Sequence, residues 1–220
     1  MARQYVFFDM DGTLVDSMYE WVNLKYKICD GYFKRTGQKI ELTEADAKHL
    51  ETLSLIGAIR FINKKYNAKI NFKLEAITLL TKFYTCDVVE IDGVRTLLEK
   101  LKNDGVKLAV ITATPKKLAK IALNTVGFSK YFDFILTPEF IKGGKTRRLI
   151  FIISALMRFT SPKNCVLVDD ANYAHKAAKR TGFKTIGIYD KWRNDSLDAC
   201  DKKFLNYNDM LEYYNKNGKL

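Results

Sequence analysis

The chain has 220 residues, 47% of them hydrophobic, and a formal net charge of +12. This length suffices for one large domain or a core with a small insertion, and no apolar run approaches the roughly 20 residues that cross a bilayer. Residues 18–87 carry 12 Lys and Arg against 8 Asp and Glu, and the remainder carries 25 against 17, a spread that predicts no nucleic-acid partner.

Short apolar runs alternating with helical segments predict one sheet. The runs are residues 5–8, 106–111, 132–136, 165–168 and 185–189. Because each run is apolar on both faces, we expect parallel strands buried between two helical layers. Predicted amphipathic helices between them include residues 94–102, 116–125 and 174–180. The alternation predicts a doubly wound α/β domain with a mostly parallel, Rossmann-like sheet.

Residues 18–87 interrupt this alternation. They contain three stretches of helical periodicity, near residues 21–33, 50–62 and 74–83, and no convincing strand. We therefore predict that residues 1–17 and 88–220 form the catalytic core and that residues 18–87 form an inserted, all-helical cap domain.

Polar residues follow four of the predicted strands. They are Asp9 and Asp11, then Thr112, then the Gly143-Gly144-Lys145 segment, and finally Asp169 and Asp170. Ligands of an open parallel sheet bind outside the carboxyl ends of its strands, so we expect these side chains to gather at one rim. Taken singly, each has an ordinary structural explanation, such as a helix cap, a strand-end hydroxyl or a solvated charge. Their joint occurrence at four strand ends favours a functional site.

This set of residue types suits phosphoryl chemistry. Several carboxylates in one place need a counterion or raised pKa values, and an all-oxygen cluster is typical of a Mg²⁺ site. A metal and a lysine together neutralise a phosphoryl group, and a carboxylate can attack its phosphorus. A second carboxylate two residues later can protonate the leaving oxygen and then activate water.

Four motifs resemble those of the haloacid dehalogenase-like hydrolase superfamily. Residues 8–17, FDMDGTLVDS, resemble its first motif, and residues 108–112, LAVIT, resemble its second. Gly144-Lys145 is similar to the third motif, and residues 166–170, VLVDD, are similar to the fourth. The resemblance covers the whole predicted core, and the helical insertion sits where members with an α-helical cap carry theirs.

The resemblance implies a role for each matched residue. Asp9 is the expected nucleophile and a Mg²⁺ ligand, and Asp11 is the expected general acid and base, with its backbone carbonyl on the metal. Thr112, Lys145 and the backbone N–H of Ala113 are expected to hold the phosphoryl group. Asp170 is expected to bind Mg²⁺, with Asp169 binding it directly or through water.

Some positions depart from the family pattern. Many members have glycine before the metal-binding aspartate and another aspartate four residues after it, where this chain has Asp169 and Ala174. The division of labour between Asp169 and Asp170 therefore stays open. Proline usually follows the motif lysine, whereas Thr146 follows it here, and Lys142 is close enough to compete with Lys145.

Asp11 narrows the reaction class that the resemblance implies. Dehalogenase and phosphonatase members lack an acid there, so its presence predicts a phosphatase acting on a small phosphorylated metabolite. A sugar-phosphate mutase is an alternative, disfavoured because Trp21 stands where beta-phosphoglucomutase has a catalytic histidine. A non-catalytic module that binds a phosphate ligand is a second alternative, which the complete motif set disfavours.

Cellular location and partners are predicted from the remaining features. Cys29, Cys86, Cys165 and Cys200 are scattered without a C-x-x-C pair, which favours reduced thiols. The N-terminal residues lack the apolar stretch of a secretory signal. We predict a cytoplasmic monomer without a membrane partner.

Overall fold

The computed structural model describes residues 4–51, 55–71, 73–137 and 144–220. The chain divides into two compact units, one formed by Met1–Met18 with Val88–Leu220 and the other by Tyr19–Asp87. Each unit has its own buried side chains, so each is described by itself. Within the described residues, no helix is both long and apolar enough to cross a membrane.

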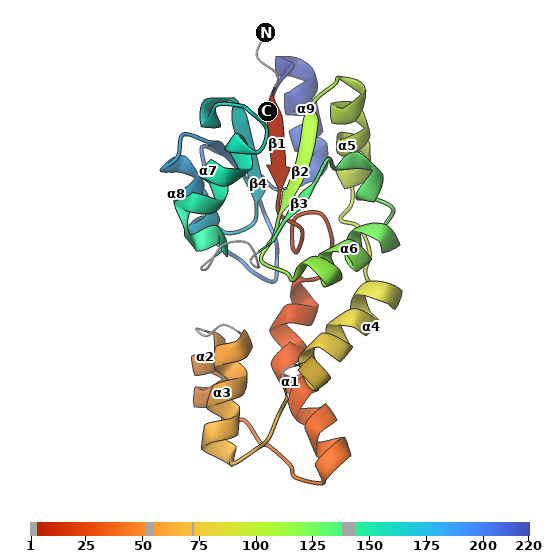
Figure 1. The fold of residues 1–220 in the computed structure, drawn as a ribbon, viewed down its shortest axis with the longest axis vertical. Helices are drawn as coiled ribbons and strands as arrows, with labels where there is room; N and C mark the ends of the chain where they lie inside the picture. Colours follow the sequence, from red (N-terminus) through yellow and green to blue (C-terminus); the bar gives the residue numbers. More distant parts are fainter. Residues whose placement is uncertain (1–3, 52–54, 72, 138–143) are drawn as a thin grey trace. The chain divides into compact units, whose positions relative to one another are not determined.

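The first unit is built on one parallel sheet of six strands (Figure 1). The strands are β1 Tyr5–Phe8, β2 Lys107–Ile111, β3 Ile135–Leu136, β4 Cys165–Asp169, β5 Lys184–Ile188 and β6 Lys202–Phe204. Their order in the sheet is β3-β2-β1-β4-β5-β6, and every neighbouring pair is parallel. The predicted doubly wound α/β class is confirmed.

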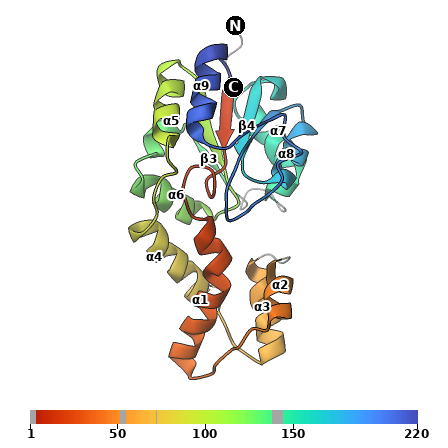
Figure 2. The same cartoon turned by 180° about the vertical axis from the view of Figure 1, so that it is seen from behind.

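Successive residues of a strand point to opposite faces of the sheet. Because consecutive residues of β2 and β4 are apolar and buried, helices cover both faces. On one face, Phe7, Ala109 and Leu167 belong to a core cluster shared with two helices, α7 Arg148–Leu156 and α8 Asn172–Lys179. The other face is covered by α5 Val94–Asn103, α6 Lys116–Thr125 and α9 Tyr207–Asn217 (Figures 1 and 2). These two layers leave the strand ends as the open rim of the sheet.

Two edge strands differ from the sequence-based expectation. The strand predicted at residues 132–136 is shorter, because only Ile135–Leu136 forms β3 and a short 3-10 helix, Ser129–Tyr131, precedes it. The aromatic residues before β3 pack against the core instead of extending the strand. The ring of Phe134, for example, packs edge-on against Phe7. Strand β6 was not predicted, because Lys202 and Lys203 are exposed and give it no apolar run. Charged residues are common on edge strands, where they prevent pairing with another chain.

All regular elements among the described residues of the second unit are helical. Its helices are α1 Met18–Thr36, which begins in the first unit, α2 Glu44–Glu51, α3 Leu55–Tyr66, a π-helical turn Lys73–Ile77, and α4 Thr78–Cys86. Residues 52–54 and 72 lie outside the description, and so does Leu53 of the predicted helical stretch. Leu24, Ile62 and Tyr84 are among its buried side chains, which shows that this unit has an apolar interior.

Candidate active site

The carboxyl end of β1 lies at the point where the order of strands reverses. From β1 the chain builds β2 and β3 on one side of the sheet, and β4 to β6 lie on the other. Phe8 is paired with Val110 of β2 and with Val168 of β4, and the backbone N–H of Asp9 donates to the Val168 oxygen at 2.9 Å. Asp9, directly after β1, thus lies next to Asp169, the last residue of β4. Such reversal points are where doubly wound sheets bind ligands.

Three carboxylates gather at this point. Asp9, Asp169 and Asp170 are buried, and each offers a carboxylate oxygen within 4.8 Å of those of the others. Lys145, on the short helix Gly144–Thr146, is buried between two of them. Its Nζ lies 2.9 Å from Asp169 Oδ2 and forms an ion pair with Asp9 Oδ2. The predicted acids and lysine are therefore brought together, whereas Lys142 and Gly143 lie outside the described residues.

Burial and mutual charge shift the titration of this cluster. Burial raises the pKa of the Asp9 carboxyl above its ordinary value, against the opposing effect of Lys145. Burial likewise holds the pKa of Asp170 well above its usual range, although Arg193 opposes it. Burial alone would lower the pKa of Lys145, but Asp169 and Asp9 outweigh it, so the ammonium stays charged. Closely spaced buried carboxylates ionise together only when enough positive charge is near.

The donor set fits a hard divalent cation. Oδ1 of Asp170 is buried and has no hydrogen-bond partner among the described residues. A buried, unpaired oxygen beside two further carboxylates is the kind of ligand that Mg²⁺ takes, together with water molecules. The residues present therefore suit a magnesium ion better than a transition metal, which favours imidazole or thiolate ligands.

Asp11 lies in the loop after β1 and is held by hydroxyl groups. Its Oδ1 accepts a hydrogen bond from Ser17 Oγ and its Oδ2 accepts one from Thr114 Oγ1, both at 2.6 Å. Gly12, with φ of 72°, turns the chain directly after Asp11. A side chain at position 12 would collide with Asp170, so glycine is needed both for the turn and for this close approach.

Thr112 and Ala113 follow β2 at the same rim. Thr112 is buried, and its Oγ1 accepts a hydrogen bond from the backbone N–H of Thr114 at 3.1 Å. Ala113 is exposed. An exposed residue beside a buried hydroxyl is an arrangement that can receive an anionic oxygen.

Three residues at this rim were missed by sequence reasoning. Ser17 and Thr114 hold Asp11, and Arg193 Nε donates to Asp170 Oδ2 at 2.5 Å. Arg193 lies in the loop after β5, one of the predicted strands. The same strand-end rule would have drawn attention to residues 189–193. Ser17 and Thr114 carried no separate signal, because an isolated hydroxyl in a loop most often bonds to nearby backbone.

Trp21 and the chain's two histidines bear on the mutase alternative. The Trp21 indole N–H donates to Tyr84 Oη at 3.0 Å, within the helical unit. His49 packs edge-on against Phe61 in the same unit. His175 is buried in α8, and burial lowers its pKa to about 4, so the ring is neutral at pH 7.

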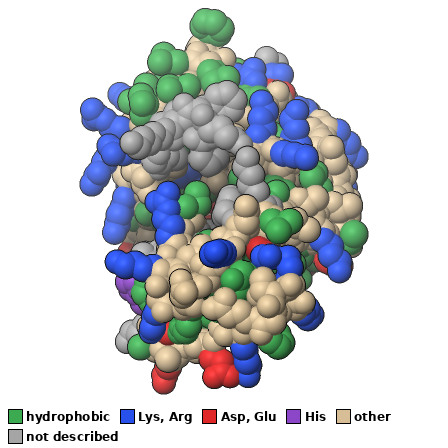
Figure 3. All heavy atoms as spheres, turned by 60° about the horizontal axis from the view of Figure 1, so that its bottom comes forward, with side chains coloured by type: hydrophobic (Ala, Val, Ile, Leu, Met, Phe, Trp, Pro, Cys, Tyr) green, Lys and Arg blue, Asp and Glu red, His purple; other side chains and the backbone are tan. Residues whose placement is uncertain are grey.

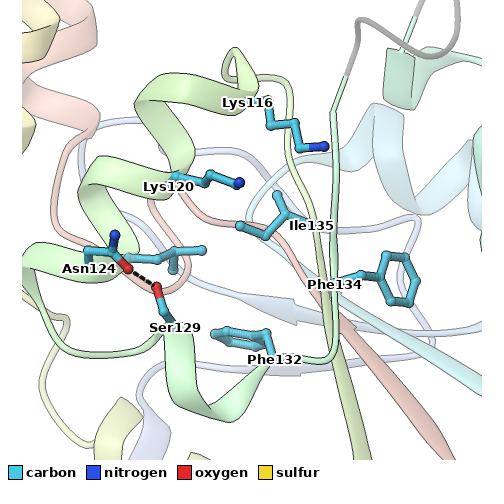
Figure 4. Close-up of a pocket in the computed structure, with 8 residues that line it drawn as sticks. Lys116, Lys120, Asn124, Ser129, Phe132, Phe134 and Ile135 are labelled. Carbon is cyan, nitrogen blue, oxygen red and sulfur yellow. Dashed lines mark hydrogen bonds between the residues drawn. The ribbon is translucent and has the colours of Figure 1, made fainter.

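A pocket of about 430 Å³ lies beside α6 (Figure 4). Its lining is Lys116, Lys120, Leu123, Asn124, Ser129, Phe132, Phe134 and Ile135. These residues include no carboxylate and none of the predicted site residues. The acid cluster, not this pocket, holds the groups that can perform chemistry.

Basic side chains are dispersed over the face shown in Figure 3. Lys and Arg atoms lie there singly or in small groups between hydrophobic and other atoms. This dispersal agrees with the spread of charge along the sequence. It differs from the continuous basic surface that is typical of nucleic-acid binding.

Comparisons with known proteins show which sequences and structures this chain resembles. The sequence matches the family described as "Haloacid dehalogenase-like hydrolase" over residues 6–188. It is 26% identical to the "Phosphorylated carbohydrates phosphatase" of Thermotoga maritima, over 82% of each chain. It is 23% identical to the "Beta-phosphoglucomutase" of Bacillus subtilis, over 83% of this chain and 82% of that one. Its fold matches the crystal structure of a "predicted phosphoglycolate phosphatase" from Haemophilus somnus, with a TM-score of 0.78, 20% identity and 97% and 98% of the two chains covered.

Proposed function

We propose, since the chain belongs to the haloacid dehalogenase-like hydrolase family, that it is a Mg²⁺-dependent phosphatase of a small phosphate monoester. Family membership confirms the resemblance drawn from the four motifs and the expectation of a hydrolase. The observation that carries the proposal is the buried cluster of Asp9, Asp169, Asp170 and Lys145, with Asp11 two residues after Asp9.

Asp9 and Asp170 are the proposed side-chain ligands of Mg²⁺, and Asp169 is proposed to bind the ion directly or through water. The backbone carbonyl of Asp11 is the remaining ligand proposed from the protein. Bound there, the ion would neutralise charge on the phosphoryl oxygens and favour the ionised form of Asp9. This assignment is supported by Oδ1 of Asp170, which is buried and has no hydrogen-bond partner in the part of the chain that the structure describes.

In the first step, an Asp9 carboxylate oxygen attacks phosphorus and the bond from phosphorus to the leaving oxygen breaks. Asp11 gives its proton to that oxygen, so the product leaves as an alcohol. Thr112 Oγ1, the Ala113 N–H and the Lys145 ammonium hold the phosphoryl oxygens. The ammonium supplies a fixed positive charge in a buried site, where it acts more strongly than in water.

In the second step, Asp11 accepts a proton from water. The resulting hydroxide attacks phosphorus, the bond from phosphorus to Asp9 breaks, and inorganic phosphate departs. Both carboxylates return to their starting states, and atoms and charge balance over the cycle. Using one carboxylate as nucleophile and the other as proton carrier divides one difficult hydrolysis into two easier steps.

Residues 18–87 are proposed to form the cap that selects the substrate, and residues 1–17 and 88–220 the catalytic core. The helical unit Tyr19–Asp87 supports this division. A small phosphorylated metabolite is the proposed partner, because the T. maritima relative is named for phosphorylated carbohydrates. We further propose that the protein acts as a cytoplasmic monomer.

A sugar-phosphate mutase is the second candidate, since a relative at 23% identity bears that name. The indole N–H of Trp21 is bonded to Tyr84 and cannot carry a proton between substrates as an imidazole can. Incubation with a hexose 1-phosphate separates the two activities. A phosphatase releases inorganic phosphate, whereas a mutase forms the 6-phosphate.

The test of the proposal is Asp9→Asn under single-turnover conditions with Mg²⁺. We expect the variant to lose phosphate release, because an amide does not attack phosphorus. The matched control is Asp198→Asn, which makes the same change at an exposed carboxylate. Activity of Asp9→Asn near the wild-type rate would show that the nucleophile is wrongly assigned. A panel of sugar phosphates, nucleoside monophosphates and phosphoglycolate then defines the substrate.

A non-catalytic module is distinguished by its response to a fluoride mimic of the transferring phosphoryl group. A competent site binds such a mimic tightly with Mg²⁺, because enzymes bind the transition state better than the substrate. A module that only binds phosphate ligands would bind the mimic no more tightly than an ordinary phosphate ligand.

A further inference from the structure

A cation from the loop after β5 lies against the acid cluster. Arg193 Nε donates to Asp170 Oδ2 at 2.5 Å. The Asp170 side chain is fully buried, and the Arg193 side chain is 26% exposed. This contact is unlike that of Lys145, which bonds to the other two carboxylates and is itself buried.

The loop that carries Arg193 is fixed in place by its own hydrogen bonds. Asp190 Oδ1 accepts from the backbone N–H groups of Trp192 and Arg193, at 2.9 and 2.8 Å. Farther along the loop, Asp195 accepts from the N–H of Asn172 at 2.9 Å, at the start of α8. The loop is therefore bonded to the same turn that follows Asp170, and these bonds hold the backbone at Arg193 in place.

The two oxygens of Asp170 have different surroundings. Oδ2 bonds to Arg193 and packs closely against Gly12, whereas Oδ1 is buried without a partner among the described residues. Arg193 Nη2 also lies 3.6 Å from Met18 Sδ, which further fixes the guanidinium. One oxygen is thus engaged by the protein, and the other is available to a metal ion.

We propose that Arg193 is a positioning residue that keeps Asp170 a one-oxygen ligand and so makes the site prefer Mg²⁺ to Ca²⁺. The inference rests on the metal site of the proposed function. Ca²⁺ takes six to eight oxygen ligands and often binds both oxygens of one carboxylate. Mg²⁺ demands a compact octahedron, keeps several waters and is satisfied by single carboxylate oxygens. A guanidinium on Oδ2 therefore removes a ligand that Ca²⁺ uses and Mg²⁺ does not need.

The test is calorimetric titration of the full chain with MgCl₂ or CaCl₂, without substrate. Wild type is compared with Arg193→Met and with Lys191→Met. The control removes the same charge from the same loop at an exposed position. We expect Arg193→Met to raise Ca²⁺ affinity relative to Mg²⁺ affinity by about tenfold, because Oδ2 becomes free to bind the larger ion. Lys191→Met should leave the ratio of the two affinities unchanged.

A purely structural ion pair predicts a different result. Arg193→Met would then unfold at a lower temperature and shift both affinities by the same factor, which would overturn the inference. If Arg193→Met does not fold, Arg193→Lys replaces it. Lysine keeps the charge without the planar fork, so we expect a smaller shift of the ratio in the same direction. An unchanged ratio in that variant overturns the inference equally.

The outcomes separate this inference from the proposed function. A shifted ratio in a chain that hydrolyses no phosphate monoester supports the role of Arg193 and refutes the reaction. An unchanged ratio in a chain that hydrolyses such esters with Mg²⁺ refutes the role of Arg193 and leaves the reaction standing. A wild-type chain that binds neither ion overturns both.

Discussion

Asp11 is bonded to a hydroxyl group at each of its carboxylate oxygens. Ser17 and Thr114 are neutral donors, one on each carboxylate oxygen. The clustered carboxylates are bonded to cations, Lys145 and Arg193. A hydroxyl group can both donate and accept a hydrogen bond, so Ser17 and Thr114 can stay bonded to the Asp11 carboxyl whether it is protonated or ionised. The two hydroxyl contacts therefore suit Asp11 to carrying a proton in the proposed reaction.

Asp11→Asn should therefore affect substrates unequally. For an alkyl phosphate, whose leaving oxygen needs a proton, we expect the phosphorylation rate to fall by about 10²–10⁴-fold. For p-nitrophenyl phosphate, whose leaving group departs as an anion, the fall in that step should be much smaller. Rapid-mixing measurements of the first turnover supply both rates. Equal losses for the two substrates would contradict a proton-transfer role.

Gly12→Ala tests the close approach of the loop to Asp170. At position 12, φ is 72° and a Cβ would lie 2.7 Å from Met18 Cγ, besides colliding with Asp170. Gly105→Ala is the matched control, because its φ is 76° and nothing lies within 4 Å of the added Cβ. The backbone strain common to both variants costs about 1–2 kcal/mol. We expect urea unfolding to show a larger loss for Gly12→Ala, and Mg²⁺ binding to weaken in that variant alone.

The positions of the acids and of Lys145 were predictable at the residue scale, because each follows a strand whose end reaches the same rim. The contacts of Arg193 and Thr114 were not. Asp11 and Thr114 are 103 residues apart in sequence, and Asp170 and Arg193 are 23 apart. Which hydroxyl or guanidinium meets which carboxylate depends on loop conformations that periodicity does not specify.

At the scale of elements, α2 depends on a reciprocal cap at its N-terminus. The Asp46 N–H bonds to Thr43 Oγ1, and Asp46 Oδ2 accepts from the Thr43 N–H and hydroxyl. Lys65 and Tyr66 of α3 also donate to Asp46. This arrangement satisfies free N–H groups at the start of α2 and fastens α2 to α3.

Asp46→Ala should lower the stability of the helical unit in a pH-dependent way. The hydrogen bonds from Lys65 and then Tyr66 hold the pKa of Asp46 below its usual value. A lowered pKa in the folded state means that the stabilisation is present above about pH 4 and is lost as pH falls. The difference in stability between variant and wild type should therefore be largest near pH 7 and become smaller in acid. Circular dichroism melts at several pH values measure it.

Glu44→Ala is the control for this prediction, since it removes an acid from the first turn of the same helix at an exposed position. This variant should lower the stability of the helical unit only slightly, and the loss should depend little on pH. A loss for Asp46→Ala that stays constant down to pH 2 would contradict the assigned titration.

The interior elements were predictable and the edges were not. Residues 5–8 and 116–125 were predicted with the bounds of β1 and α6, since both have many buried positions and clear periodicity. β3 has two residues and β6 has exposed lysines, so neither shows an apolar run that matches its bounds. Edge strands are buried on fewer sides than interior strands. Because the apolar pattern of a strand results from burial, edge strands are harder to recognise in a sequence.

At the scale of the whole molecule, the acid cluster links metal binding to stability. Asp9, Asp169 and Asp170 repel one another in a buried site, and burial raises the pKa of Asp9 and Asp170. An ion that binds only the folded chain stabilises it by mass action, by about 2.7 kcal/mol at 100 times its dissociation constant. We expect Mg²⁺ to raise the melting temperature and EDTA to reverse the rise. Asp170→Asn should abolish most of the effect, and Asp198→Asn should leave it intact.

The aspartyl-phosphate on Asp9 is the central claim, and chemical trapping tests it most directly. Asp11→Asn is mixed with p-nitrophenyl phosphate and Mg²⁺, because loss of the general base should leave the phosphorylated enzyme to accumulate. The reaction is quenched in acid and treated with borohydride, which reduces an acyl phosphate to an alcohol, and its peptides are analysed by mass spectrometry. The account predicts a reduced side chain at position 9 and at no other carboxylate. Release of p-nitrophenol without any reduced residue, or reduction at a different aspartate, would contradict it.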